Sequence, residues 1–538
     1  MDSTRSRLTR AGQIVVVLVT AALLVYFVVW PIGNVLRQGL WANGSLRFEP
    51  LTDVLSNRRN RRIVGFTLWQ ATISTLVSLA IGLPLTYLLE RRRPWGAALV
   101  RALVLVPFAL PTVVVGIAFL AFFAATGPLG ELRIAQTTTI IVVAHVYFNV
   151  AVVVRIVGPR WRLFDERPSM AARVLGAGSW NCWKATTVPA LAGVVVNAAA
   201  VVFLFCMTSF GVVAVLGGPR NTTIETEIYR LTTQELALDR ASGLVIAQLS
   251  AVLATMWIAQ RSWRRSEAVK LRVAEPMLHR RRATAVTDVV MMIGAIAFVV
   301  TPLTFVVERA LRDDGLGFRM LARKSAFGWS PIDSVKQSLQ MAVWATVIAL
   351  VLGVVIAVAL SRRWTGARVL GPLSVLPIGV SAVTLGFGFL IALDRPIDVR
   401  DRWQLVPVAH ALVALPIVLR TLLPVFQGIA KSTREAAIIL GASPSRVVRY
   451  VDLAVARRAI GTSAAFAAAI SFGEFGATSF IARTDTPTMP IAIAKLLSRP
   501  GASTRATAYA VSVVLIVIVC VVIGLAGIQR RGRLEVDR

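Results

Sequence analysis

The sequence predicts an all-α membrane protein with about twelve transmembrane helices in two parallel six-helix repeats. The 538 residues are 56% hydrophobic and 16% charged, and their mean hydropathy is +0.71. This apolar share exceeds that of ordinary soluble domains. Apolar runs of roughly 18 or more residues recur along the chain, and each is long enough to cross about 30 Å of hydrocarbon as a helix. Segments of the second half also match segments of the first.

The net charge of +31 comes from basic residues that gather between the apolar runs. In a soluble protein such a charge would indicate a nucleic-acid partner. Here the clusters at 91–93, 261–265 and 280–282 lie in short segments between apolar runs, which is the pattern of cytoplasmic loops. We therefore expect a multi-pass protein of the plasma membrane, surrounded by a lipid bilayer and without a nucleic-acid partner.

Both termini are predicted to be cytoplasmic. Arg5, Arg7 and Arg10 precede an apolar stretch that runs into Trp30 without a small-residue cleavage site. We interpret this stretch as a retained first transmembrane helix and not as a signal peptide. An even number of crossings then returns the C-terminus to the cytoplasm.

The apolar segments follow one another along the whole chain, and the loops between them are expected to alternate between the two sides of the membrane. One cluster contradicts the alternation, because four arginines fall in the predicted external segment before the second helix: Arg58, Arg59, Arg61 and Arg62. The sequence offers no physical account of them. The twelve segments lie near residues 14–33, 63–89, 98–125, 136–158, 190–217, 241–260, 286–308, 338–360, 368–393, 403–424, 459–482 and 508–528.

An internal repeat relates the two halves of the chain. Residues 67–82 align with residues 338–353 without insertion or deletion. Later matches keep a second, slightly shorter constant separation, and they pair Ala144, His145, Arg155, Ala171, Ala172, Gly176, Phe210 and Gly211 with Ala409, His410, Arg420, Ala436, Ala437, Gly441, Phe475 and Gly476. Because six crossings separate the copies, both have the same orientation, and the repeat is parallel.

These features predict two repeated membrane domains with flanking segments. The segment between the halves, residues 261–285, is basic and poor in apolar residues, which indicates a cytoplasmic linker or, alternatively, an amphipathic surface helix. The predicted divisions are 1–62 (tail, first helix and external loop), 63–261 (first domain), 262–333 (linker, seventh helix and external loop), 334–528 (second domain) and 529–538 (cytoplasmic tail).

Two long cytoplasmic loops, at about 159–189 and 425–458, carry the most informative motif. Each has an alanine pair followed by a glycine, which gives a thin helix face and a sharp turn into a second short helix. Such a shape suits a projection that docks in a groove of a partner protein. The residues concerned are Met170, Ala171, Ala172, Gly176 and Pro189 in the first loop, and Glu435, Ala436, Ala437 and Gly441 in the second.

Both loops resemble the EAA loop of ABC importer permeases, whose pattern is Glu-Ala-Ala, three residues, Gly, nine residues and then Ile-x-Leu-Pro. Each copy departs from the pattern at a different position. Met170 stands where the family favours Glu, and Ala454 stands where it favours Pro. The resemblance covers essentially the whole chain, and it implies a type I importer fold, two ATPase subunits docked on the two loops and an external solute-binding protein.

We expect the chain to be a transport subunit and not an enzyme, without cofactor or metal. It contains no Gly-x-x-x-x-Gly-Lys-Ser/Thr phosphate loop, so ATP hydrolysis would belong to the partner. The cysteines match no metal or disulfide spacing. Single-chain permeases of this kind are similar to the branch that imports thiamine, ferric iron or phosphonates, and the segment 471–490 looks most like the thiamine type. An ion-coupled secondary transporter is the alternative from a different class.

Polar residues inside the apolar segments are candidates for the translocation path. Glu474 and its repeat partner Ser209 lie in apolar surroundings. A carboxylate in the membrane costs roughly 2.5–3.5 kcal/mol, so it usually faces a cavity or a partner. Glu474 either lines a path for a cationic solute or satisfies a neighbouring backbone or arginine. His145 and His410 are interpreted as interhelical hydrogen-bond partners.

Prolines in the third and ninth segments are candidates for hinges. Pro107 and Pro111 precede Gly116, and Pro377 precedes Gly386. Proline breaks or bends a spanning helix, because it lacks an N–H and clashes with the preceding turn. The sequence does not distinguish a moving hinge from an ordinary packing kink.

Overall fold

The computed structural model describes residues 2–42, 45–46, 48–124, 127–267, 285–325, 327–395, 398–482 and 485–531. Most of the predicted linker, residues 268–284, and the end of the predicted tail lie outside the described residues. Apart from one short hairpin, the described chain consists of helices and the loops that join them. Among the described residues, ten helices are long and apolar enough to cross a membrane, and the number rises to twelve if each of two bent helix pairs is one span. The prediction of an all-α membrane protein with about twelve spans is confirmed.

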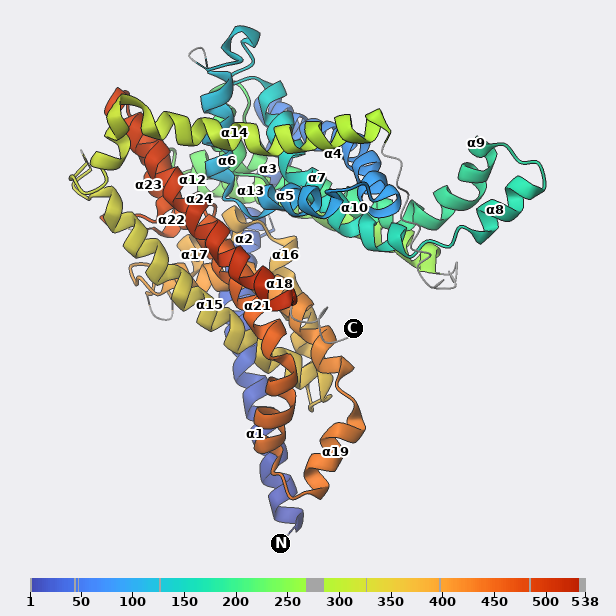
Figure 1. Ribbon diagram of the computed structural model, residues 1–538. Coiled ribbons are helices and arrows are strands. Elements are labelled where there is room, and N and C mark those ends of the chain that lie inside the picture. Colours follow the sequence, from blue (N-terminus) through green and yellow to red (C-terminus); the bar gives the residue numbers. More distant parts are fainter. Residues whose placement is uncertain are drawn as a thin grey trace. The chain divides into compact units, whose positions relative to one another are not determined.

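Figure 1 labels many of the α-helices along the chain. The elements follow one another in the order below, in which η denotes a π- or 3₁₀-helix. Up to residue 267 they are α1 (Asp2–Leu24), η1 (Val25–Val29), α2 (Trp30–Leu40), β1 (Trp41–Ala42), β2 (Ser45–Leu46), α3 (Glu49–Ser56), α4 (Arg58–Tyr87), η2 (Leu88–Arg92), α5 (Ala97–Ala109), α6 (Thr112–Phe123), η3 (Gly130–Leu132), α7 (Thr138–Arg162), α8 (Arg167–Val174), α9 (Ser179–Cys182), η4 (Trp183–Thr187), α10 (Val188–Met207), α11 (Gly211–Leu216), α12 (Ile224–Thr233) and α13 (Leu238–Glu267). From residue 286 they are α14 (Val286–Arg319), α15 (Pro331–Ser361), η5 (Ala367–Val369), α16 (Leu370–Gly379), α17 (Ala382–Ala392), α18 (Leu405–Gly428), α19 (Lys431–Ile439), α20 (Pro444–Val447), η6 (Val448–Asp452), α21 (Leu453–Gly473), α22 (Thr478–Ile481), α23 (Met489–Leu497) and α24 (Ala502–Arg531).

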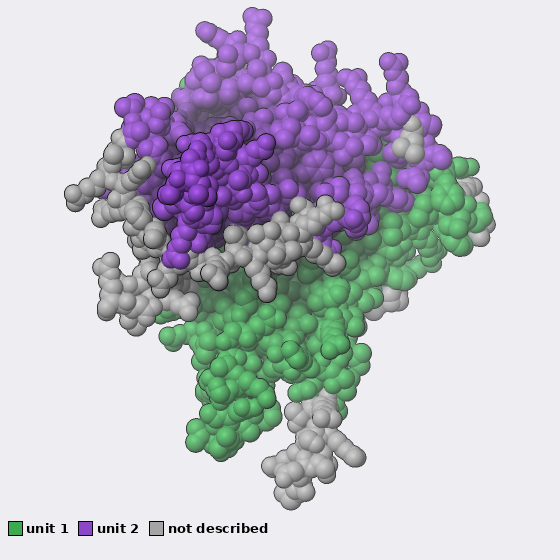
Figure 2. Space-filling model, turned by 90° about the vertical axis from the view of Figure 1, so that its right-hand side faces the viewer, with its two compact units in different colours: residues 1–50, 228–245, 310–538 green, residues 51–227, 246–309 purple. Residues whose placement is uncertain are grey.

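The chain divides by packing into two compact units, coloured separately in Figure 2. Unit 1 contains residues 1–50, 228–245 and 310–538, and unit 2 contains residues 51–227 and 246–309. The core of unit 1 is built from α15, α18 and α21, and that of unit 2 from α4, α7 and α10. In both units the contact faces are mainly Val, Leu, Ile and Ala side chains. Between spanning helices it is close van der Waals packing of such side chains that stabilises the contact, because lipid tails are as apolar as they are.

The helix that precedes each repeat packs with the other repeat. In unit 1, Leu24 and Val28 are fully buried in the core formed by α15 and α18, and the indole Nε1 of Trp30 donates to the carbonyl of Ala392 at 3.1 Å. In unit 2, Val299 of α14 lies in the core with α4 and α7, and the hydroxyl of Tyr147 donates to its carbonyl at 2.9 Å. Neither repeat therefore completes its core from its own sequence alone.

Matching contacts confirm the internal repeat. Thr67 Oγ1 accepts a hydrogen bond from the backbone N–H of Ile224 at 3.0 Å, and Ser338 Oγ accepts one from Met489 at 2.7 Å. The two acceptors, Thr67 and Ser338, are related by the longer of the two constant sequence separations between the repeats. The two donors, Ile224 and Met489, are related by the shorter one.

Two glycines also occupy matching close contacts. A Cβ at Gly82 would lie 2.8 Å from Val153, and one at Gly353 would lie 2.5 Å from Val418. Glycine at these positions lets α4 approach α7, and α15 approach α18, more closely than any other residue would.

The third and ninth predicted segments are each broken into two helices. The paths bend by 103° between α5 and α6, and by 107° between the helices that flank residue 380. Leu110 is extended because it precedes Pro111, which caps the start of α6, and Pro107 lies in the last turn of α5. Pro377 lies in the last turn of α16. The prolines thus lie at or near both breaks, while a hinge motion there stays a prediction.

Candidate docking loops and buried polar sites

The two predicted docking loops have the same backbone geometry. α8 and α19 end in a glycine with φ of +84°, Gly176 in the first loop and Gly441 in the second. The next residue donates its N–H back across the last turn at 3.0 Å, from Ala177 to Ala172 and from Ala442 to Ala437. This is the αL termination in which glycine avoids the steric penalty of a Cβ. The predicted turn into a second short helix is confirmed by α9 and α20.

Each loop presents large apolar side chains to the outside. Val174 and Leu175 are both 87% exposed, and their repeat partners Ile439 and Leu440 are 84% and 87% exposed. Neither α8 nor α19 contains a buried residue. Exposed apolar patches of this kind mark sites of contact with another protein or with the membrane. The sequence motif identified the loops, but the projecting pairs were not among the predicted site residues.

The predicted loop residues lie on these surfaces. Met170 is 47% exposed, and Glu435 forms an exposed ion pair with Lys431 at 3.1 Å. Pro189 lies in the first turn of α10. The remaining predicted residues, Ala171, Ala172, Ala436 and Ala437, lie in the last turns of α8 and α19.

A buried ion network holds the second loop to its unit. Asp452, which is fully buried, accepts from Arg362 Nη2 at 2.7 Å and Nε at 3.0 Å, and from Arg434 Nε at 2.8 Å. Arg434 also donates to the carbonyl of Phe426 at 2.9 Å. This site was not among the predicted ones, although an aspartate beside the apolar residues Val451 and Leu453 was the available signal.

Glu474 is buried at the C-terminal end of α21 in unit 1. Its carboxylate accepts from the backbone N–H groups of Ala477 at 2.8 Å and Thr478 at 2.9 Å, and it also bonds the Thr478 hydroxyl. His410 Nε2 lies 3.3 Å from Glu474 Oε2, while His410 Nδ1 lies 2.7 Å from Ser471 Oγ. The interhelical role predicted for His410 is confirmed. The translocation role of Glu474 stays a prediction, as does that of the half-buried Ser209.

A cavity of about 940 Å³ lies in unit 1 between the end of α18 and the start of α21. Its charged lining residues are Arg457 and Arg458, and the rest of its wall includes Thr421, Val425 and Thr462. A positive lining repels cations and attracts anions. Glu474 is not part of this wall, so the cavity and the buried carboxylate are separate features.

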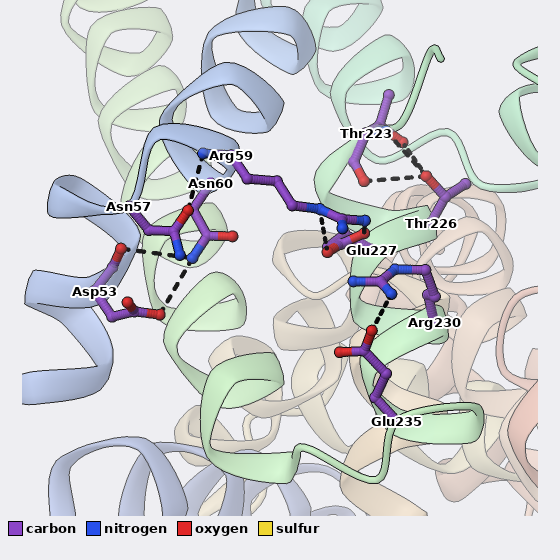
Figure 3. A network of polar contacts seen from close by, with 9 residues as sticks. All are labelled: Asp53, Asn57, Arg59, Asn60, Thr223, Thr226, Glu227, Arg230 and Glu235. Atoms are coloured by element: carbon purple, nitrogen blue, oxygen red, sulfur yellow. Dashed lines mark hydrogen bonds and ion pairs between the residues drawn. The ribbon is translucent and has the colours of Figure 1, made fainter. Parts of the chain in front are cut away.

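The unexplained arginine cluster begins α4, and Figure 3 shows its surroundings. Asn57 caps the helix by accepting from the N–H of Arg59 at 2.9 Å. The Arg59 guanidinium forms an ion pair with Glu227 at 3.4 Å, and the Glu227 side chain is 2% exposed. Arg59 thus has a structural partner within unit 2. Arg58, Arg61 and Arg62 are exposed.

We expect Arg59→Gln to destabilise unit 2 and Arg58→Gln to leave it unchanged. The first substitution removes the guanidinium that faces a buried carboxylate, which should cost about 1 kcal/mol because the arginine itself is largely exposed. The second should change stability by less than about 0.5 kcal/mol. The apparent melting temperature in detergent measures both, and equal shifts for the two variants would contradict the assignment.

Known proteins resemble this chain over most of its length. It is 26% identical over 457 residues to the thiamine transport system permease protein of Brucella abortus, covering 82% of each chain. It is 25% identical over 484 residues to the protein of the same name from Escherichia coli K12, covering 85% of this chain and 87% of that protein. The molybdenum transport system permease protein of Azotobacter vinelandii is 30% identical over 176 residues, which are 31% of this chain and 78% of that protein. No family model matches the sequence.

A duplicated helical bundle with two projecting loops defines a multi-pass membrane transport subunit. The stretch of 176 residues that matches the molybdenum transport system permease protein is about as long as one repeat of this chain. The chain belongs to the permease subunits of ABC importers.

Proposed function

We propose that this permease imports thiamine, handed over by an external solute-binding protein and driven by two ATPase subunits. The observation that carries the proposal is the pair of matching loops with exposed apolar tips, in a chain whose full-length relatives are thiamine permeases. ATP hydrolysis belongs to the separate subunits. In this proposal the protein spans the plasma membrane with both termini in the cytoplasm. The proposed domain limits are those predicted from the sequence.

In this proposal each ATPase receives one loop, formed by α8–α9 in the first repeat and by α19–α20 in the second. Closure of the ATPases on ATP moves the loops, and the loops move the spanning helices to which they are joined. Prolines at the breaks in the third and ninth segments are proposed hinges. Glu474 is proposed to favour the positively charged thiazolium of thiamine, because opposite charges attract most strongly where water is scarce.

Uptake of labelled thiamine at nanomolar concentration tests the proposed cargo. Cells lacking the gene should lose uptake, and the intact gene should restore it. A Gly441→Asp copy that reaches the membrane should not restore it, because a Cβ at φ +84° strains the turn that presents the loop. Unchanged uptake after gene loss would discard thiamine, and uptake of ferric iron would then be measured as the second candidate.

A further inference from the structure

A buried carboxylate and its two arginine partners tie the second docking loop to three spanning helices. Asp452 ends η6 and leads into α21, while Arg362 follows the last residue of α15. Arg434 projects from α19, and its second bond reaches Phe426 near the end of α18. The side chains of Arg362 and Arg434 are 17% and 15% exposed, and that of Asp452 is inaccessible. Asp452, Arg362 and Arg434 together therefore fix the loop against the ends of α15 and α18 and the start of α21.

Such a network is rigid for physical reasons. A buried carboxylate is costly unless its partners compensate it, and here one oxygen receives two arginine donors and the other receives a third. Hydrogen bonds between ionised groups are shorter and stronger than neutral ones, and a guanidinium fork adds directional constraint. Moving α19 away from α15 would separate these charges in a site that excludes water.

The first repeat keeps the helix-end arginine but not the network. Arg91, the repeat counterpart of Arg362, pairs with Glu166 and donates to the carbonyl of Phe164 at 3.1 Å. The Glu166 side chain is 51% exposed, so water and salt weaken this pair. Ser169 and Thr187 stand at the positions of Arg434 and Asp452, and neither carries a charge.

We propose that Asp452 is a positioning residue that couples the second docking loop to α15, α18 and α21, and that the first loop is attached more compliantly. The movement of the ATPase partners then reaches the spanning helices chiefly through the second loop. This inference rests on the proposed function, since it takes the loops to be the sites of ATPase contact. It adds that the two loops differ in how rigidly they are attached to the spanning helices, although their backbones are alike.

Asp452→Asn tests the proposal in the complete transporter, purified with its ATPase and reconstituted with its binding protein. The substitution keeps the size of the side chain and removes the charge. We expect the ATPase still to co-purify and ATP hydrolysis to change by less than about twofold, while import per ATP falls about tenfold, because a loosened buried ion pair no longer transmits movement. Asp452→Glu should restore part of the import per ATP.

Glu166→Gln is the matched control, and it should change import per ATP by less than about twofold because its ion pair is exposed. Arg434→Gln leaves the Arg362–Asp452 pair in place, so it should give an intermediate loss and serves if Asp452→Asn fails to accumulate. Equal losses of import per ATP in Glu166→Gln and Asp452→Asn would overturn the proposed difference in attachment between the two loops. Import, hydrolysis and co-purification falling in parallel would overturn coupling, because that is the result of a purely structural role. Failure of the unmodified chain to bind an ATPase would instead overturn the proposed function.

Discussion

Replacing Leu175 and Leu440 together by aspartate is expected to abolish co-purification of the ATPase and to reduce solute uptake more than tenfold. Both leucines are 87% exposed at the tips of the docking loops. A buried apolar anchor at an interface is typically worth about 2 kcal/mol or more, and a charge in the same groove adds a desolvation cost. Because each ATPase receives one loop, each would lose one anchor, and about 2 kcal/mol corresponds to roughly thirtyfold weaker binding before the desolvation cost is added.

Leu236→Asp is the control for this experiment. Leu236 is 75% exposed but lies between α12 and α13, outside both docking loops. Its substitution should leave uptake and co-purification unchanged within about twofold, since surface changes away from contacts have small effects. Retained ATPase binding by the Leu175/Leu440 double variant would refute the docking role of the tips.

Glu474→Gln is expected to lower stability by about 3 kcal/mol and to reduce uptake about tenfold. The carboxylate accepts hydrogen bonds from two backbone N–H groups at 2.8 Å and 2.9 Å. The side-chain amide of glutamine has an NH₂ group in place of one oxygen, and this group would face one of the two N–H donors without being able to accept from it. Hydrogen bonds to a charged group contribute about 1.5–3 kcal/mol each, which sets the scale of the loss. Thermal unfolding in detergent and thiamine uptake in cells measure the two effects.

Ser250→Ala is the control and should change both readouts little, because Ser250 is exposed and its hydroxyl bonds the backbone of its own helix. A Glu474→Gln protein that is as stable as the original but imports poorly would support a direct role in the path. Unchanged uptake of a cationic solute would eliminate that role.

Much of the fold was predictable because the membrane imposes it. Backbone groups in hydrocarbon have no water to bond, so apolar runs of sufficient length become helices, and all twelve segments correspond to helices or to bent helix pairs. The repeat was predictable because close-contact glycines such as Gly82 and Gly353 are preserved in both copies. The breaks before Thr112 and Ala382 were less predictable, since the chain there stays apolar on both sides.

The candidate sites were predictable in part. Gly176 and Gly441 identified both docking loops, because an αL termination favours glycine. The Asp452 network was not predicted, since its arginines lie 90 and 18 residues away in sequence and meet it through tertiary packing. The sequence offered bonding to a neighbouring backbone as one of two interpretations of Glu474, and the structure shows such bonds, but the particular partners Ala477 and Thr478 depend on where α22 begins.

The packing of each leading helix with the opposite repeat sets an order of events during synthesis. Leu24 and Val28 are made first, but their neighbours Ile356 and Leu415 emerge more than three hundred residues later. At about 5–20 residues per second, the ribosome needs on the order of tens of seconds to supply them. The first helix therefore waits in the lipid without its partners, which is consistent with a sequence apolar around most of its circumference. Assembly of unit 1 begins only when the second repeat has entered the membrane.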